Sequence, residues 1–377
     1  MISRCEAQSS CATNVLRNFG RSDKMNTMTN SRIAVKFLCG HRPDVFCGVA
    51  DYTSTLTAQL QEQGIAAEII SQDNWNLGSI AALRTNILSE PTPDIIHVQY
   101  PTYAYGASIA PHLSTFFTKC PIVVTFHELA HSHTLRKLSS LLFLFNADAF
   151  VFCSQEDRDY YSNKIPAFRR QSFTIPIGSN IPVFDGAVVH EKDLIMTFGQ
   201  IRPRKGIEQF IELAKLSRAE GGAHRFLVIG ATLGRFRSYG EEMRAAARRL
   251  PIEWRLDLEP AEVARAISPA AAAYLPFPDG ASERRGTLLA VLGSGVPTVT
   301  TSGRHTPPAL DDCVIYADTP EQALPMINHL LADPSLRLRL SRNASAYASR
   351  YSWRSIARQH VECIGPFWQK GVGSQPK

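Results

Sequence analysis

Short apolar runs alternate with longer amphipathic stretches from residue 32 almost to the end of the chain. The short runs are rich in β-branched residues, which is typical of buried strands. The longer stretches repeat their apolar positions at helical spacing. Apolar strands that alternate with helices predict a parallel sheet covered on both faces. The predicted fold class is therefore α/β, with doubly wound, Rossmann-like sheets.

The alternation occurs in two sets. The first runs from RIAVKFLC to SFTIPI and is followed by the turn-rich stretch GSNIPVFDGAVVHEKD, and the second begins at LIMTFG. We predict an N-terminal domain at 31–187, a C-terminal domain at 188–350, and a closing helix at 351–370 that crosses back to the first domain. Doubly wound sheets bind ligands beyond the carboxyl ends of their strands, so two such domains would face each other across a cleft.

Residues 1–30 differ from the rest, because they are rich in serine, asparagine and threonine and lack the apolar core of a secretory signal. Their lack of periodicity predicts a disordered extension. Elsewhere, no apolar run is long enough to predict a membrane-spanning helix. The eight cysteines include no C-x-x-C pair, which favours reduced cysteines in a cytoplasmic protein.

The net charge of +6 is modest, and the basic residues are scattered along predicted helices. No nucleic-acid-binding motif accompanies them, so we expect no nucleic-acid partner. A weak attraction to anionic lipid headgroups remains open, and with it a peripheral contact with the inner face of a membrane.

Residues 127–131 have the sequence His-Glu-Leu-Ala-His, the pattern of zinc metalloproteases. Such a zinc site needs His127 and His131 one turn apart on a helix, with Glu128 as the base. The preceding run, PIVVTF, instead predicts a buried strand. His127 is then expected at the carboxyl end of a strand, where the two histidines cannot share a helical face, and we expect no metal site.

The loop after LIMTF carries chemistry suited to phosphate. Arg202 and Lys205 lie in the cationic stretch RPRKG directly before a predicted helix. Helix N-termini attract phosphate, and Arg and Lys donate charge-assisted hydrogen bonds. A solvated basic turn is the alternative, but the expected position at a strand end facing a cleft favours phosphate binding.

The loop after AAAYLPF has a similar character. Gly286 and Thr287 begin the next predicted helix and can offer backbone N–H groups to an anion. Just before them, Ser282 or Glu283 could bond sugar hydroxyls, and Arg285 adds a cation. Each residue alone also fits a helix cap or a surface ion pair, so the prediction depends on the two loops together.

These motifs, in this order, resemble those of retaining GT-B glycosyltransferases, the family 4-like enzymes of glycosyltransferase group 1. FGQIRPRKGIEQFIELAK resembles their Gly-Arg-Leu-x-x-x-Lys-Gly unit, and LPFPDGASERRGTLLAVLGSGVPTVTT resembles their second donor-binding unit. GVADYTSTLTAQLQEQG resembles the glycine loop and helix after their first strand, and PIVVTFHELAH a later strand end. The resemblance covers nearly everything from residue 32 to 370 and implies a GT-B fold.

The resemblance also implies roles for individual residues. His127 matches the histidine whose side chain points at the donor sugar, and it is the implied catalytic residue. Gly48 and Val49 match the loop whose amides approach the donor phosphates, and Lys205 matches the diphosphate-binding lysine. We expect Arg285 to hold the diphosphate from the other domain, opposite His127.

The chain departs from the family pattern in three places: one glycine, one arginine and a pair of glutamates. Cys47 stands where the family often has a first glycine. Gln200 replaces an arginine that binds diphosphate, and Arg202 could substitute for it. The second of two glutamates, which bonds the ribose, is replaced by Ala290. The first falls at Ser282, with Glu283 adjacent. A branch of the family with a Ser-x-Arg-Arg-Gly-Ser-type segment is most similar here.

The resemblance implies a retaining, hexosyl-type transferase that moves a sugar from a nucleoside-diphosphate sugar to a glycan or lipid-linked acceptor in polysaccharide biosynthesis. It needs no metal or cofactor, because cations and helix N-termini neutralise the leaving diphosphate. The missing glutamates motivate an alternative, a catalytically impaired nucleotide-sugar-binding scaffold in a glycan-assembly complex. A GT-B-fold epimerase or phosphorylase is a third reading. The sequence lacks the cleft carboxylates expected of an epimerase, and a phosphorylase would normally need a longer chain.

Deleting residues 1–28, so that the chain starts at Thr29, should leave the melting temperature unchanged, because the deleted residues contribute no periodic apolar face. Thermal unfolding of the two chains measures this directly. A shortened chain that fails to fold would contradict the prediction.

Overall fold

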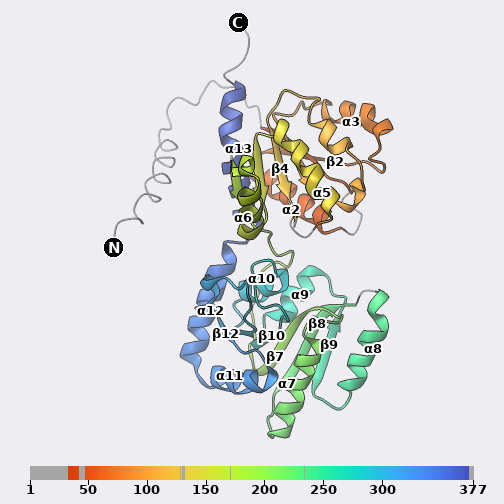
Figure 1. Ribbon diagram of the computed structural model, residues 1–377. Helices are drawn as coiled ribbons and strands as arrows, with labels where there is room; N and C mark the ends of the chain where they lie inside the picture. Colours follow the sequence, from red (N-terminus) through yellow and green to blue (C-terminus); the bar gives the residue numbers. More distant parts are fainter. Residues whose placement is uncertain are drawn as a thin grey trace, which may run out of the picture. The chain divides into compact units, whose positions relative to one another are not determined.

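The computed structural model describes residues 33–41, 47–127, 129, 132–169, 171–232 and 234–372, apart from the side chains of Arg235 and residues 368–372. Figure 1 shows the chain coloured along its sequence. The disorder expected for residues 1–30 lies outside the described residues, and so do Glu128 and His131 of the zinc-protease pattern.

The N-terminal half contains a six-stranded parallel sheet in the order β2-β1-β3-β4-β5-β6. Its strands are β1 (Ala34–Leu38), β2 (Ala66–Ile70), β3 (Ile95–Tyr100), β4 (Ile122–Phe126), β5 (Ala149–Phe152) and β6 (Ser172–Thr174). Its helices are α2 (Gly48–Glu62), α3 (Ile80–Ile87), α4 (Ala110–Ser114), α5 (Thr134–Ser140) and α6 (Gln155–Lys164), with 3-10 turns η1 (Leu77–Ser79), η2 (Tyr103–Tyr105), η4 (Leu141–Phe145) and η5 (Pro166–Arg169). Every residue of β1, β3 and β4 is buried, as the unbroken apolar runs predict.

The C-terminal half contains a second six-stranded parallel sheet, in the order β12-β11-β10-β7-β8-β9. Its strands are β7 (Glu191–Gln200), β8 (Arg225–Ala231), β9 (Ile252–Leu256), β10 (Ala270–Leu275), β11 (Thr298–Thr300) and β12 (Val314–Tyr316). Its helices are α7 (Ile207–Ala219), α8 (Arg237–Ala246), α9 (Pro260–Ile267), α10 (Gly286–Gly293), α11 (Pro320–Ala332) and α12 (Pro334–Ser349), with 3-10 turns η6 (Gly234–Phe236) and η7 (Pro308–Leu310).

Both faces of the second sheet are packed. In β8, Leu227 and Ile229 belong to one core cluster, which includes residues of α9, α10 and α12. The alternating residues Phe226 and Val228 belong to another, which includes residues of α7, α8 and α11. Because successive side chains of a strand point to opposite faces, this division shows helices on both sides of the sheet. The predicted fold class, two doubly wound α/β domains of GT-B type, is confirmed.

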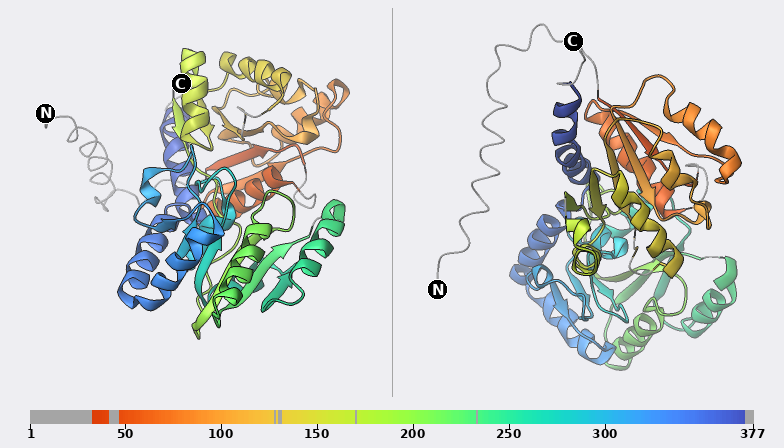
Figure 2. Two further views of the ribbon diagram at one scale, coloured as in Figure 1. Left: turned by 60° about the horizontal axis from the view of Figure 1, so that its bottom comes forward. Right: turned by 45° about the horizontal axis from the view of Figure 1, so that its top comes forward.

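The last helix, α13 (Trp353–Val372), returns to the N-terminal half and packs against α2 (Figures 1 and 2). The Tyr52 hydroxyl of α2 and His360 Nε2 of α13 form a buried hydrogen bond of 2.8 Å. The ring of His360 lies 5.3 Å from that of His97 on β3, and the ring of Tyr52 lies 5.2 Å from that of Trp353. Aromatic and imidazole rings therefore fill the contact between the first and last parts of the fold. Within the described ranges, every helix is too short or too polar to span a bilayer.

Burial shifts the histidines of this contact toward their neutral form. It lowers the pKa of His360 and of nearby His127 to about 3, and it lowers the pKa of His97 well below its ordinary value. The cause is the cost of placing a charged imidazolium in an apolar interior, to which the neighbouring histidines add a repulsion at His97 and His360.

The free energy of unfolding should fall as the pH is lowered from about 6.5 towards 3. Unfolded histidines bind protons below about pH 6.5, whereas these three buried histidines stay neutral until much lower pH. For each pH unit below about 6.5, each of these histidines therefore lowers the free energy of unfolding by up to ~1.4 kcal/mol, and the three together lower it by about 4 kcal/mol. Urea unfolding at pH 7.5, 6 and 5 measures the slope.

His360→Gln should reduce this slope by about one proton's contribution, while His329→Gln, which changes an exposed histidine of α11, should not change it. An equal slope in all three proteins would show that the buried histidines do not control the acid sensitivity.

Candidate functional site

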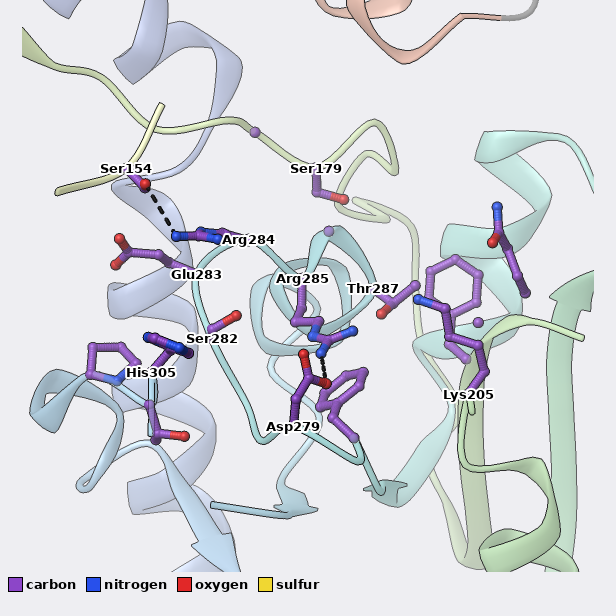
Figure 3. Close-up of a pocket in the computed structure, with 18 of the residues that line it drawn as sticks. Ser154, Ser179, Lys205, Asp279, Ser282, Glu283, Arg284, Arg285, Thr287 and His305 are labelled. Atoms are coloured by element: carbon purple, nitrogen blue, oxygen red, sulfur yellow. Dashed lines mark hydrogen bonds and ion pairs between the residues drawn. The ribbon is translucent and has the colours of Figure 1, made fainter. Parts of the chain in front are cut away.

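A cavity of about 1080 Å³ is lined by residues of both halves, most of them in loops that follow strands (Figure 3). The C-terminal half contributes the end of β7, Lys205, the loop between β10 and α10, and residues 304–307. The N-terminal half contributes Ser154, Glu156 and residues 178–181. Its position matches the usual ligand site of doubly wound sheets, beyond the carboxyl ends of the strands.

Lys205 reaches the cavity from the loop between β7 and α7. Gly206, the next residue, has φ of 82°, and a Cβ atom there would overlap the carbonyl oxygen of Pro276. Only glycine allows this close approach, which holds the loop against the end of β10. Burial, Arg202 and Arg285 lower the pKa of Lys205, in that order of effect, while Asp279 raises it. A bound anion would relieve this repulsion, so the loop is suited to phosphate.

Arg285 is held in place immediately before α10. Its guanidinium forms an ion pair with Asp279 and lies 4.8 Å from the centre of the Phe277 ring, which leaves its side chain 17% exposed. Gly286 and Thr287 follow as the first residues of α10 and also line the cavity. Helix geometry leaves their N–H groups without partners inside the helix, so two N–H donors and the Arg285 cation lie together at the start of α10.

Contacts across the cavity join the two halves. Arg284 forms an ion pair with Glu156 at the start of α6 and lies 3.4 Å from the Ser154 hydroxyl (Figure 3). His305 Nδ1 lies 3.4 Å from the same Glu156 carboxylate. The sequence analysis missed Glu156 and His305, because each lies more than a hundred residues from a partner in the other half.

Two further predicted residues, Ser282 and Glu283, line this cavity. The Tyr351 hydroxyl donates a 3.2 Å hydrogen bond to the Glu283 carboxylate. Ala290 of α10 is 4% exposed and belongs to a core cluster. The position where the family pattern has a carboxylate is therefore apolar in this chain.

Arg202 is placed differently from the other predicted cations. Gln200 lines the cavity and Arg202 does not, although Arg202 is close enough to lower the pKa of Lys205. Arg202 Nε instead donates a 3.1 Å hydrogen bond to Gln200 Oε1. A direct substitution for the missing arginine stays a prediction, and in this structure Arg202 acts on the cavity through Gln200 and through its charge.

A second cavity, of about 1330 Å³, lies in the N-terminal half and is lined by Gly48, Val49 and His127. It shares Gly178 and Asn180 with the first cavity, so the two spaces adjoin. Apart from Arg202, which lines neither cavity, the predicted residues divide into two groups: six line the first cavity (Lys205, Ser282, Glu283, Arg285, Gly286 and Thr287) and three line the second (Gly48, Val49 and His127).

His127 follows β4 directly, as predicted, and does not lie on a helix. Its side chain is buried, 8% exposed, and its two ring nitrogens lie 2.8 Å from Gln99 Oε1 and 3.6 Å from Cys153 Sγ. Its ring also contacts Tyr52 edge-on, with centroids 4.8 Å apart. His127 therefore forms part of the wall of the second cavity, and its expected place opposite Arg285 beside one ligand stays a prediction.

Within the described ranges, no three His, Cys, Asp or Glu side chains are grouped so that they could hold a metal ion. Cys39 and Cys153 are buried and Cys120 is half-buried, which agrees with the core or near-core positions expected for them.

Comparison with known proteins finds a family match in the N-terminal half. Residues 39–180 match the model of Glycosyltransferase Family 4. A comparison with curated protein sequences finds no match.

Solved structures extend the similarity to the whole fold. A glycosyltransferase from Rickettsia africae is 13% identical with a TM-score of 0.69, over 92% of this chain and 100% of that chain. HepE of Anabaena, solved with UDP and glucose, is 14% identical with a TM-score of 0.63, over 89% and 100%. Sucrose-phosphate synthase from Thermosynechococcus elongatus is 15% identical with a TM-score of 0.57, over 91% and 100%. Residues 39–180 thus share the sequence pattern of Glycosyltransferase Family 4, and the fold of the described chain is that of GT-B proteins.

Lys205→Ala should weaken the binding of a nucleoside diphosphate by about 1.5 to 3 kcal/mol, the usual contribution of a charge-assisted hydrogen bond. Isothermal titration with UDP, GDP and ADP measures the affinity. Lys215→Ala, which removes an exposed lysine of α7, is the matched control and should have no effect. Equal affinity in the Lys205 variant and the control would refute the assignment of Lys205.

Proposed function

We propose that this family 4-like chain of GT-B fold is a retaining, hexosyl-type glycosyltransferase. It moves a sugar from a nucleoside-diphosphate sugar to a glycan or lipid-linked acceptor in polysaccharide biosynthesis. The first cavity binds the nucleoside diphosphate of the donor and the adjoining second cavity binds the acceptor, so the donor sugar lies where the two meet. The approach of Gly48, Val49 and His127 to the donor from the second cavity stays a prediction. The observation that carries the proposal is the convergence of Lys205, Arg285 and the N-terminus of α10 on one cavity.

The arrangement suits a diphosphate leaving group. As the bond between the sugar and the diphosphate breaks, negative charge accumulates on the phosphate oxygens. Two cations and the N–H groups of Gly286 and Thr287 surround a space large enough for a nucleotide sugar. Fixed donors of this kind stabilise developing charge without a metal ion, so the proposed reaction requires neither a metal nor a cofactor. The UDP bound to HepE, on the same fold, supports a nucleotide donor.

The carboxylates around the first cavity have other partners. Asp279 pairs with Arg285, Glu156 with Arg284 and His305, and Glu283 accepts a hydrogen bond from Tyr351. The described lining of the second cavity contains no Asp or Glu. A covalent sugar–enzyme intermediate needs a carboxylate nucleophile at the reacting carbon. This distribution therefore favours substitution from the face of the leaving group. The acceptor hydroxyl forms the new bond and passes its proton to the departing phosphate oxygen.

An alanine at position 290, where the family pattern has a glutamate, favours a second candidate, a nucleotide-sugar-binding scaffold. Without a carboxylate at that position, the ribose loses a strong hydrogen-bond acceptor. In a scaffold the cationic cavity would still hold the diphosphate, but the donor would not be turned over.

Thermal stabilisation by a panel of nucleotide sugars separates these candidates when followed by an assay for hydrolysis of each stabilising donor. A transferase should be stabilised by one donor and should release its nucleoside diphosphate slowly into water. A scaffold should be stabilised without turnover. A protein that is stabilised by no nucleotide sugar and by no nucleoside diphosphate would overturn both proposals.

His127→Gln should lower donor turnover at least tenfold and leave donor affinity within about threefold. His127 lines the second cavity, away from the cations that hold the diphosphate, so its contribution should arise mainly as the transition state forms. Cys153→Ala removes one partner of the ring but keeps the imidazole, and it serves as a control that should retain most of the turnover. A His127 variant that loses donor affinity and turnover in equal measure would place His127 at the donor instead.

A further inference from the structure

Exposed apolar side chains are concentrated on one part of the N-terminal half. Seven of the thirteen large apolar side chains that are exposed in the described ranges lie between residues 103 and 145. Four of them, Leu135, Leu138, Leu142 and Phe145, succeed one another at intervals of three or four along α5 and η4. This spacing places them on one side of the helical segment, and we call these four residues the apolar stripe.

The apolar stripe borders the second cavity. Leu135, Leu138 and Leu142 line it and are 64%, 57% and 37% exposed, while Phe145 is 79% exposed beyond it. The neighbouring Asn146 amide donates a hydrogen bond to the hydroxyl of Thr115, which brings Phe116, itself 59% exposed, close to the end of the stripe. Exposed apolar area on this scale, next to a cavity, usually marks a surface that is covered in use.

Positive charge accompanies the apolar stripe. Residues 101–147 contain three basic residues, Lys119, Arg136 and Lys137, and only one acidic residue, Glu128. Arg136 and Lys137 project from α5 itself, and the Arg136 guanidinium lies 5.3 Å from the centre of the exposed Tyr103 ring. Leucine and phenylalanine beside arginine, lysine and tyrosine form the composition of helices that lie in the interface of an anionic membrane.

The same charges argue against a second copy of the chain as the occupant of this surface. A symmetric dimer would place the stripe of one copy against the same stripe of the other, together with Arg136 and Lys137 of both. No acidic residue of the described part of residues 101–147 is available to neutralise them. Anionic lipid headgroups supply that complement.

The second cavity also has polar groups suited to a headgroup. Thr102 and Trp353 line the cavity, and the Thr102 hydroxyl and the Trp353 indole N–H are buried beside it without a hydrogen-bond partner among the described residues. An amphiphile would satisfy both parts of this lining, with hydroxyls near Thr102 and Trp353 and an apolar chain along the leucines.

We propose that the apolar stripe, with Arg136 and Lys137, docks on an anionic lipid bilayer and presents the second cavity to lipid-linked acceptors at the membrane surface. The docking surface stands on its own observations, whereas the assignment of the cavity to an acceptor rests on the proposed function. Of the two acceptor classes left open above, this favours the lipid-linked one.

Flotation with vesicles tests the docking. The full-length protein should float with phosphatidylcholine vesicles that contain 30 mol% phosphatidylglycerol, as a chosen probe, and less with pure phosphatidylcholine vesicles. Binding should weaken as salt is added, because the charges act through a screened interaction.

The double variant Lys137→Gln/Phe145→Ser changes one cation and one apolar residue of the surface, neither of which lines the second cavity. Its partition coefficient should fall by at least about 50-fold, from about fivefold for the charge and at least tenfold for the ring. The matched control Leu338→Ser/Arg339→Gln removes an exposed leucine and an exposed arginine from α12 and should bind like the unchanged protein.

Crosslinking from a photoactivatable diazirine on the acyl chain of a phospholipid locates the contact. Labelled peptides should include residues 134–145, and label on residues 101–108 would place the lipid at the second cavity. Failure of the unchanged protein to float, equal loss in the control variant, or label confined to other helices would overturn the proposal. So would sedimentation that shows a dimer abolished by Phe145→Ser.

Donor binding separates this result from the proposed function. Nucleotide-sugar stabilisation should be the same in the surface variant and the unchanged protein, because the donor cavity is not altered. Loss of vesicle binding with intact donor binding supports the docking surface. Intact vesicle binding in a protein that is stabilised by no nucleotide would refute the proposed function and leave the docking surface standing.

Discussion

The parallel pairing of β7 with β10 is the contact on which the first cavity depends. The two strands lie side by side in the second sheet, although about seventy residues separate them in the chain, so the loops that follow them leave the sheet at the same edge. One loop carries Lys205 and the other carries Arg285. Gly206 has no side chain to overlap Pro276, so the first loop can pack closely against the end of β10. Two cations are thereby held close to each other before any anion is bound.

The charge balance of this cavity follows from that constraint. Burial and then the nearby charges of Arg202 and Arg285 lower the pKa of Lys205, because a charged lysine that is partly buried beside like charges raises the free energy of the folded protein. Asp279 offsets the charge of Arg285, and Glu156 offsets that of Arg284. The pairs are partly exposed, so each contributes little to stability. A diphosphate can therefore compete for these cations at a modest free-energy cost.

The last helix, α13, packs against α2 and so joins the end of the chain to the N-terminal half. The hydrogen bond between Tyr52 and His360 joins α2 to α13, and Trp353 at the start of α13 lines the second cavity. The same aromatic group contacts His127 through Tyr52. The packing that holds the end of the chain thus also forms a wall of the second cavity. Because its buried histidines are neutral in the folded protein, this packing should become less stable as the pH is lowered.

Local pattern was enough to predict the two sheets, the strand before His127 and the phosphate-suited loops. Unbroken apolar runs, helical periodicity and glycines before helices are properties of neighbouring residues, and they determine the type of each element whatever its partners. The same local information placed Lys205 and Arg285 at strand ends, and the parallel sheet then brought the two together.

Only the tertiary structure decided that His127 and Arg285 line two adjoining cavities, that Arg202 acts beside Gln200, and that Glu156 reaches Arg284. It also decided that the leucines of α5 remain exposed, where the sequence pattern allowed a buried face equally well. The reason is that burial and side-chain direction depend on which surfaces pack together, and contacts between residues more than a hundred positions apart leave no trace in the spacing of either segment.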